Sequence, residues 1–270
     1  MKIYSFLALC FALPLFAGSV ICIDDAVQAE FSGNEKIVFT RHSTGKATVY
    51  DLKSRKTTQF DFTGNSFSSL HNGKVFFCGD GIFPQLFILD TADGKTKEIA
   101  TSDAPSGTIF KVSPDVWAFP GGYDKVPKLL YINEKTLQEL TPRKLPAGTV
   151  SVSSNGKYVA VQFDNGTCNI KVVEIATGKT IFITNTVSGS MQKNGCHSPV
   201  FSPDSKKLLY VSGDIQPLAD IMLYDLEKSR LIRLTTDGKD NQRPRWSADG
   251  KRYCHSTLRN GKYCTVIKEL

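Results

Sequence analysis

Short apolar segments separated by tight polar turns recur along almost the whole chain. The first set of six segments begins at Lys36, Lys74, Asp115, Lys157, Lys207 and Lys251. A second apolar segment follows each of these and ends at Asp51, Asp90, Asn133, Glu174, Asp225 and Lys268. Both sets repeat every 38 to 51 residues. Self-similarity at this period, built from short strands, is typical of a propeller whose blades follow one another along the chain.

Segments such as Leu86–Leu89 and Ile221–Tyr224 are apolar at consecutive positions, so both of their faces require cover. Turn dipeptides such as Asn155-Gly156 and Asn260-Gly261 provide the positive backbone angles that two-residue hairpins require. Nothing in the sequence has the pattern of a long helix. The sequence therefore predicts an all-β fold, a six-bladed β-propeller of four-stranded antiparallel blades.

The last repeat has only three predicted strands, near 243–247, 252–257 and 263–269. At the other end, Ala29–Ser32 aligns with Pro244–Ser247 as the inner strand of the first blade. This leaves Val20 to Asp25 free to serve as the missing outer strand. We therefore predict that the ring is closed by an N-terminal strand that pairs with the last blade.

The start of the chain has the pattern of a secretory leader. Lys2 precedes an apolar run from Ile3 to Ala17, and cleavage sites with small residues follow after Ser19 and after Ala29. Cleavage after Ser19 is favoured, because it keeps the closing strand. An uncleaved membrane anchor is the alternative. The predicted organisation is a signal peptide over 1–19 and a propeller over 20–270, in a periplasmic or secreted protein.

Two repeats also carry a recognisable motif. Phe201–Tyr210, followed by Ile221–Leu226 and Arg233–Thr235, resembles the TolB-type propeller repeat, and Arg243–Lys251 resembles the opening of the next copy. The resemblance is strongest over about 196–257. The separate α/β domain that precedes the propeller in TolB has no counterpart before the first predicted blade. The resemblance implies an exported propeller that binds other molecules.

Charge and composition narrow the choice of partner. The formal net charge is +7, with basic and acidic residues interspersed. No basic stretch contains interleaved stacking aromatics, so we predict no nucleic-acid binding. The partner expected for such an exported protein is an envelope or extracellular protein or peptide, with peripheral contact to an anionic envelope surface as a further option.

Cleavage after Ser19 leaves six of the seven cysteines, an even number that suits an oxidising compartment. A turn at Asn260-Gly261 places Cys264 opposite Thr257, so Cys254 and Cys264 are expected on opposite faces of the hairpin. Cys22 and Cys264 are the disulfide candidates, since both are predicted on neighbouring strands. Buried free thiols are the equal alternative. No Cys-x-x-Cys pair is present, and we predict neither a metal site nor a cofactor.

No catalytic motif is recognisable: the sequence has no nucleophile elbow, no phosphate-binding glycine loop and no His-Glu-x-x-His. His42 and His197 are expected in loops, and His255 within a strand. The recurring Asp51, Asp90 and Asp225 each end a predicted strand, where a carboxylate accepts backbone N–H bonds of the following turn. We therefore predict a structural role for these aspartates.

The predicted turns between first and second strands are tight, whereas the second-to-third loops and the blade connections are longer. Long segments include 79–84, 120–128, 184–199, 213–220 and 235–244, and all of them emerge on one face. Binding residues concentrate on loops held by a rigid scaffold. The candidate binding residues on this face are Phe83, Tyr123, Gln192, Lys193, Asn194, His197, Asp214, Gln216, Asp240, Asn241 and Arg243.

Two functional hypotheses remain. The preferred one is a non-enzymatic binding module for a protein or peptide, acting through the loop-rich face or the central channel. The alternative is a propeller enzyme, a lyase or hydrolase, with an axial polar or metal site. Converging His, Asp and Glu side chains at the axis favour the enzyme, whereas a channel lined by backbone, Ser and Arg favours binding.

Overall fold

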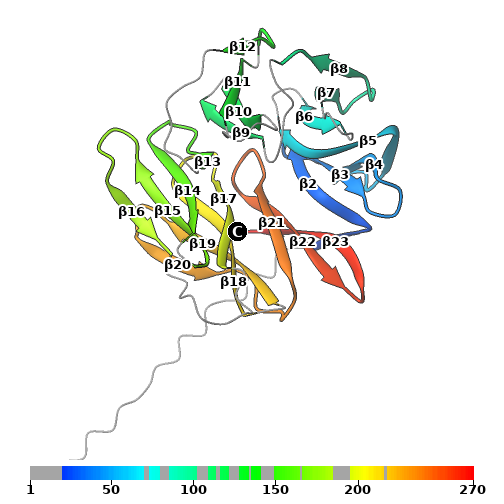
Figure 1. The fold of residues 1–270 in the computed structure, drawn as a ribbon. Coiled ribbons are helices and arrows are strands. Elements are labelled where there is room, and N and C mark those ends of the chain that lie inside the picture. The colour runs from blue at the N-terminus through cyan, green and yellow to red at the C-terminus, as the bar shows by residue number, and fades with distance from the viewer. Residues whose placement is uncertain are drawn as a thin grey trace, which may run out of the picture.

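A computed structural model describes residues 20–69, 73–79, 85–101, 109–113, 116–121, 128–133, 135–140, 149–164, 166–184, 195–215 and 218–270. All of the secondary-structure elements in this part are β-strands, and they form antiparallel sheets. The predicted all-β class is therefore confirmed for these residues. Figure 1 shows the sheets fanned about a common centre. Within the same residues, no helix is long and apolar enough to span a membrane.

The first sheet has seven strands in chain order. Its central strand, β5, is thirteen residues long; one end pairs with β4 and the other with β6. The strand turns from one partner to the other at Gly64, where a Cβ would lie 2.6 Å from the Phe77 ring. Only glycine fits this close approach. The strands are β2 (Ala26–Ser32), β3 (Lys36–Arg41), β4 (Lys46–Asp51), β5 (Thr57–Ser69), β6 (Lys74–Gly79), β7 (Leu86–Asp90) and β8 (Thr96–Ile99).

Three four-stranded sheets follow, each with its strands in chain order. The first comprises β9 (Phe110–Ser113), β10 (Val116–Gly121), β11 (Lys128–Asn133) and β12 (Glu139–Leu140). The second comprises β13 (Thr149–Val152), β14 (Tyr158–Asp164), β15 (Cys168–Glu174) and β16 (Thr180–Ile183). The third comprises β17 (Gly195–Phe201), β18 (Lys207–Ile215), β19 (Leu218–Asp225) and β20 (Arg230–Arg233).

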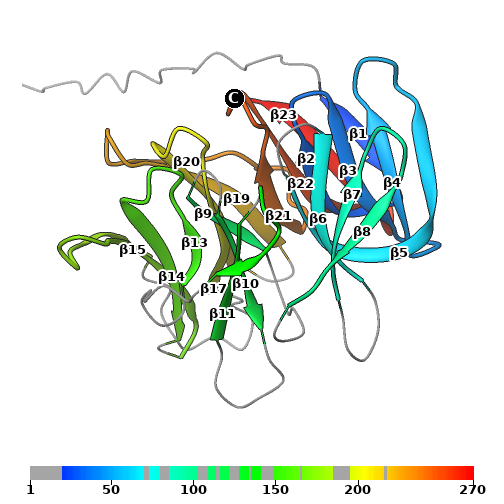
Figure 2. The same ribbon diagram turned by 90° about the horizontal axis from the view of Figure 1, so that it is seen from above.

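The last sheet joins the two ends of the described chain. Its order is β21 (Asn241–Trp246), β22 (Arg252–Arg259), β23 (Lys262–Glu269) and β1 (Ile21–Asp24). Strand β1 pairs antiparallel with β23, from Ile21 opposite Ile267 to Asp24 opposite Cys264. This is the pairing predicted for residues 20–25, and Figure 2 shows β1 in the group with β23 and β22.

The predicted strand positions agree with the structure to within one residue at the start of the second strand of each repeat. Cys264 lies opposite Thr257, as the Asn260-Gly261 turn predicted. Three predicted loops are too long: β17 begins inside 184–199, β21 begins inside 235–244, and most of 213–220 is strand, because β18 continues to Ile215 and β19 begins at Leu218. The ladder extends because Ile215 pairs with Leu218 beyond a register shift.

The hydrophobic core lies between sheets, not on one side of them. Ile37 and Val38 are consecutive and therefore point to opposite faces, yet both are fully buried. Ile37 packs with Phe31 and Cys254 towards the last sheet, whereas Val38 packs with Phe77 towards β6. The first strands of successive sheets also contact one another, β9 with β13, β13 with β17, β17 with β21 and β21 with β2. These strands form the inner layer on which the candidate site lies.

Candidate functional site

The predicted binding residues divide into two groups. Phe83, Tyr123, Gln192, Lys193, Asn194 and Gln216 lie outside the described residues, and Asp214 lies on β18. The remaining four, His197, Asp240, Asn241 and Arg243, lie on or beside the inner strands β17 and β21. Asp240 and Arg243 both act electrostatically on the His197 ring, so the structure brings these three together. His197 was expected in a loop and instead lies within β17.

Three inner strands share a local distortion. The ladder register shifts at Val27–Glu30 of β2, His197–Val200 of β17 and Gln242–Arg245 of β21. Each shift contains a non-glycine residue with positive φ: Gln28 at 54°, Ser198 at 54° and Arg243 at 53°. Such a conformation costs on the order of 1–3 kcal/mol, and a bulge redirects the side chains beside it. The bulges thus direct polar side chains towards the inner layer, whereas a regular ladder would direct these side chains elsewhere.

The Arg243 side chain is exposed to solvent and forms no hydrogen bond or ion pair with the described part of the chain. Protein atoms around the guanidinium partly desolvate it, which lowers the pKa of Arg243, and the like charge of Arg245 adds to this effect. The charge nevertheless persists at neutral pH, because an arginine pKa starts far above 7. Arg243 is therefore a cation held near the inner strands, and no group in the described part of the chain occupies its donors.

His197 faces the same region. Its Nδ1 lies 3.0 Å from the Ser198 hydroxyl oxygen, and the Ser198 backbone N–H donates to Gln162 Oε1 across 3.4 Å. Burial lowers the pKa of His197; Asp240 opposes this shift and Arg243 adds to it. The ring is consequently neutral at pH 7 and provides one donor and one acceptor.

A buried ion pair lies next to Arg243. The Nε of Arg245 on β21 is 3.1 Å from Oε2 of Glu30 on β2. Glu30 is only 7% exposed, and burial raises its pKa to about 7 against the opposing effect of Arg245. We name Glu30, His197, Asp240, Arg243 and Arg245 the inner-strand cluster. It combines two carboxyl groups, of which that of Glu30 is about half-neutralised at pH 7, with two guanidinium groups and one imidazole.

Sequence reasoning did not single out Glu30 or Arg245. The signal was nevertheless present, because the alignment of Ala29–Ser32 with Pro244–Ser247 places these two residues at equivalent positions of neighbouring inner strands. Opposite charges at equivalent positions of adjacent repeats are close in space when the repeats stack.

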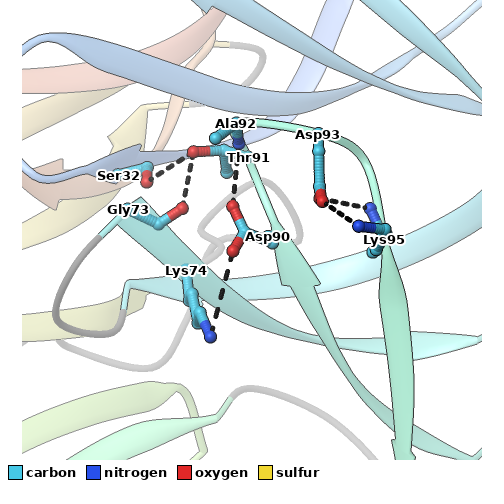
Figure 3. A network of polar contacts seen from close by, with 8 residues as sticks. All are labelled: Ser32, Gly73, Lys74, Asp90, Thr91, Ala92, Asp93 and Lys95. Atoms are coloured by element: carbon cyan, nitrogen blue, oxygen red, sulfur yellow. Dashed lines mark hydrogen bonds and ion pairs between the residues drawn. The ribbon is translucent and has the colours of Figure 1, made fainter.

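The recurring aspartates have the structural role that was predicted. Asp51 Oδ1 accepts the backbone N–H of Ser54 at 2.7 Å, and Asp225 Oδ1 accepts that of Lys228 at 2.8 Å. Figure 3 shows the same arrangement around Asp90, which accepts the Ala92 N–H at 2.9 Å. Nearby, the Thr91 hydroxyl group donates to the Gly73 carbonyl oxygen at 2.5 Å. These carboxylates stabilise the turns that follow their strands.

His255 lies within β22, as predicted, and is almost fully buried. The six cysteines of the described chain are separate thiols. Cys22 and Cys264 lie on neighbouring strands with their sulfur atoms within 4.8 Å of each other. The disulfide between them stays a prediction. Among the described residues, the one group of three side chains suited to hold a metal is formed by Cys22, Cys264 and Asp24, away from the inner-strand cluster.

Comparison with known proteins identifies the fold. No protein-family profile matches the sequence, and no curated protein matches it either. Among solved structures, a putative TolB from Agrobacterium tumefaciens is 13% identical, with a TM-score of 0.59 over 94% of this chain and 98% of that one. TolB from Acinetobacter baumannii is 14% identical, with a TM-score of 0.57 over 94% of this chain. The match spans 64% of that structure's length.

An oligogalacturonate lyase in complex with manganese is also similar, at 13% identity and a TM-score of 0.53 over 93% of this chain and 90% of that chain. These identities establish a fold and no more. The chain accordingly has a TolB-like β-propeller fold, as the repeat motif predicted, and propellers of this kind occur in proteins of different function.

Proposed function

We propose that this protein is an exported six-bladed β-propeller that binds a protein or peptide at its axis. Six clusters of buried side chains support the blade count, since each joins two successive sheets or the two halves of the seven-stranded sheet. In this interpretation β5 serves as both the outer strand of the first blade and the inner strand of the second. The pairing of β1 with β23 then closes the ring.

We further propose export and a processing site that are compatible with this closure. We place a signal peptide over 1–19 and the propeller over 20–270, in the periplasm or outside the cell. Cleavage after Ala29 would remove β1 and half of β2, leaving β23 as an unpaired edge.

We expect the intact mass of the protein purified from its producing cells to correspond to a chain that begins at Val20. A leader is removed at a single peptide bond, so one mass should dominate, and Edman sequencing gives the same position independently. A chain that begins at Glu30 would contradict the closure by β1, and a chain that retains residues 1–19 would contradict export by cleavage.

Arg243 is the observation that supports binding. A guanidinium without a hydrogen-bond partner among the described residues, held at a strained bulge beside the buried Glu30–Arg245 pair, is suited to a carboxylate. The neutral His197 and the Ser198 hydroxyl group add hydrogen-bonding groups of the kind that recognise peptide. We infer that the partner offers an acidic side chain or a terminal carboxylate to Arg243.

Arg243→Ala should weaken binding to acidic peptides by tenfold or more, since a hydrogen bond to a charged group contributes roughly 1.5–3 kcal/mol. The probe is an immobilised set of peptides in which Asp and Glu are replaced stepwise by Asn and Gln. Arg230→Ala is the matched control, because Arg230 is an exposed arginine on the outer strand β20. Equal binding of acidic and neutral peptides, or equal loss in both variants, would reject this site.

The second candidate is a lyase or hydrolase with an axial metal. It is suggested by the similarity to an oligogalacturonate lyase in complex with manganese and by the electrostatic interaction of His197 with Asp240, which offer two of the ligands that a metal would require. A lyase should shorten oligogalacturonate and create unsaturated ends that absorb ultraviolet light, and His197→Ala should abolish this. If the absorbance stays constant with Mn²⁺ present, the lyase is rejected and the binding module is retained.

A further inference from the structure

The two ends of the described chain bring three potential metal ligands together. Cys22 and Asp24 alternate on β1, so their side chains share one face, and Asp24 lies directly opposite Cys264 of β23. The two sulfur atoms and a carboxylate oxygen all lie within 4.8 Å of one another, and Cys22 Sγ is 3.9 Å from Asp24 Oδ1. The three ligands therefore form a triangle across the closing strand pair.

We propose that Cys22, Asp24 and Cys264 bind a zinc ion that fastens β1 to β23. Two thiolates and one carboxylate suit Zn²⁺, whereas Mg²⁺ and Ca²⁺ require oxygen ligands. Tetrahedral bonds of about 2.3 Å place two thiolates roughly 3.8 Å apart. Side-chain rotation alone supplies a change of that size from the separation in the structure.

Access and charge also fit a metal ion. Asp24 is exposed, whereas Cys264 is only 1% exposed, so the site is open on the carboxylate side and closed beneath. The exposed side lets the ion enter and leaves a fourth position for water. Two thiolates, one carboxylate and Zn²⁺ carry one net negative charge, and the Arg259 guanidinium lies beside Cys22 to balance it.

The strand register separates this proposal from a disulfide. Cys22 pairs with Val266, and Cys264 pairs with Asp24, so the two cysteines are diagonal neighbours. Diagonal Cα atoms are typically about 7–8 Å apart, whereas a disulfide requires roughly 4.4–6.8 Å. A metal ion bridges the longer distance without movement of the backbone. The sequence placed Cys22 and Cys264 on neighbouring strands, and the structure adds Asp24 as the third ligand.

The test is a Co²⁺ titration of the full-length protein as purified, kept reduced with a phosphine and free of chelators. We expect one equivalent of Co²⁺ to bind with a thiolate-to-cobalt absorption band, and Zn²⁺ to displace it and raise the melting temperature. Cys22→Ser should abolish the band. Asp24→Asn, an exposed substitution, should weaken affinity tenfold or more, while Cys168→Ser, which removes a partly exposed thiol on β15, should leave binding unchanged.

Three results would overturn the proposal. The first is a reduced protein that gives no thiolate band, and the second is a band that persists in Cys22→Ser. The third comes from the intact mass under non-reducing conditions with thiol labelling: a native Cys22–Cys264 disulfide would confirm the sequence prediction and exclude the metal. Circular dichroism of each variant separates loss of a ligand from loss of the fold. None of these readouts depends on the proposed axial binding.

Discussion

Ile23→Ser should lower the free energy of unfolding by at least about 3 kcal/mol, whereas Val20→Ser should change it by less than about 0.5 kcal/mol. Both residues belong to the N-terminal segment, but Ile23 is 6% exposed and Val20 is 61% exposed. Ile23 packs with Ala26, Phe31 and Ile267 between the first and last sheets. Serine there removes the buried side chain and adds an unpaired hydroxyl group.

The measurement is urea unfolding of both variants and the wild type, followed by tryptophan fluorescence and circular dichroism. A loss of β1 pairing would expose the edge of β23, so Ile23→Ser should also aggregate at lower protein concentration. Equal midpoints for Ile23→Ser and Val20→Ser would contradict the closure, because they would mean that β1 contributes nothing to the folded state.

The repeats could be predicted because local chemistry determines their turns. In the copy at Ser202, the hydroxyl group donates to Asp204 at 2.6 Å, and Asp204 accepts the Lys206 N–H at 3.0 Å. The copy at Ser247 repeats this with Asp249 at 2.7 Å. A turn that is stabilised by residues two and four positions apart can be recognised in the sequence. Each such turn determines where the strands on both sides of it begin and end.

The features that the sequence did not predict depend on contacts between repeats. The continuous strand β5 replaces a blade connection because Gly64 lies against Phe77 of the next strand, and nothing near Gly64 in the sequence indicates that contact. The inner-strand bulges require positive φ at Gln28 and Arg243, residue types that do not indicate it. Glu30 meets Arg245 only once the last sheet packs on the first.

The candidate site is consequently the least predictable part of the molecule. The sequence identified the region of His197, Asp240 and Arg243 through loop length, although His197 proved to be in a strand. The Glu30–Arg245 ion pair and the group of Cys22, Asp24 and Cys264 each join residues from the two ends of the described chain, which meet only in the folded structure. Motifs of short spacing indicate neither group, whereas the repeat alignment and the predicted closing strand place the members of each on neighbouring strands.

Glu30→Gln should stabilise the protein at pH 8 by about 3 kcal/mol and leave its stability unchanged at pH 4. Burial raises the folded-state pKa of Glu30 to about 7, against 4.5 in the unfolded chain. A raised pKa means that the folded state holds the proton more tightly, so its contribution to stability is complete below pH 4.5. It is lost as pH rises through 7, a difference of about 3 kcal/mol.

The charged groups around Glu30 determine the size of this pH-dependent difference in stability. Arg245 attracts the Glu30 carboxylate, and the buried Cys254 thiol lies near that carboxylate. Arg243 interacts with Arg245 as a like charge. The amide that Glu30→Gln introduces has the shape of the protonated carboxyl group, so the variant imitates the low-pH state at every pH. Arg245 is 18% exposed along its side chain and keeps some access to water when its partner is neutral.

The experiment compares urea midpoints of Glu30→Gln and the wild type from pH 4 to pH 8, because the difference cancels groups that titrate in both proteins. Glu35→Gln is the control, since Glu35 is exposed in the turn before β3. The opposite sign at pH 8 would mean that attraction to Arg245 exceeds the cost of burial, since removing one partner of a buried pair then costs roughly 3–5 kcal/mol. In that case Glu30 fixes Arg245 as a structural anion, and protonation near neutral pH would loosen the inner-strand cluster, not strengthen it.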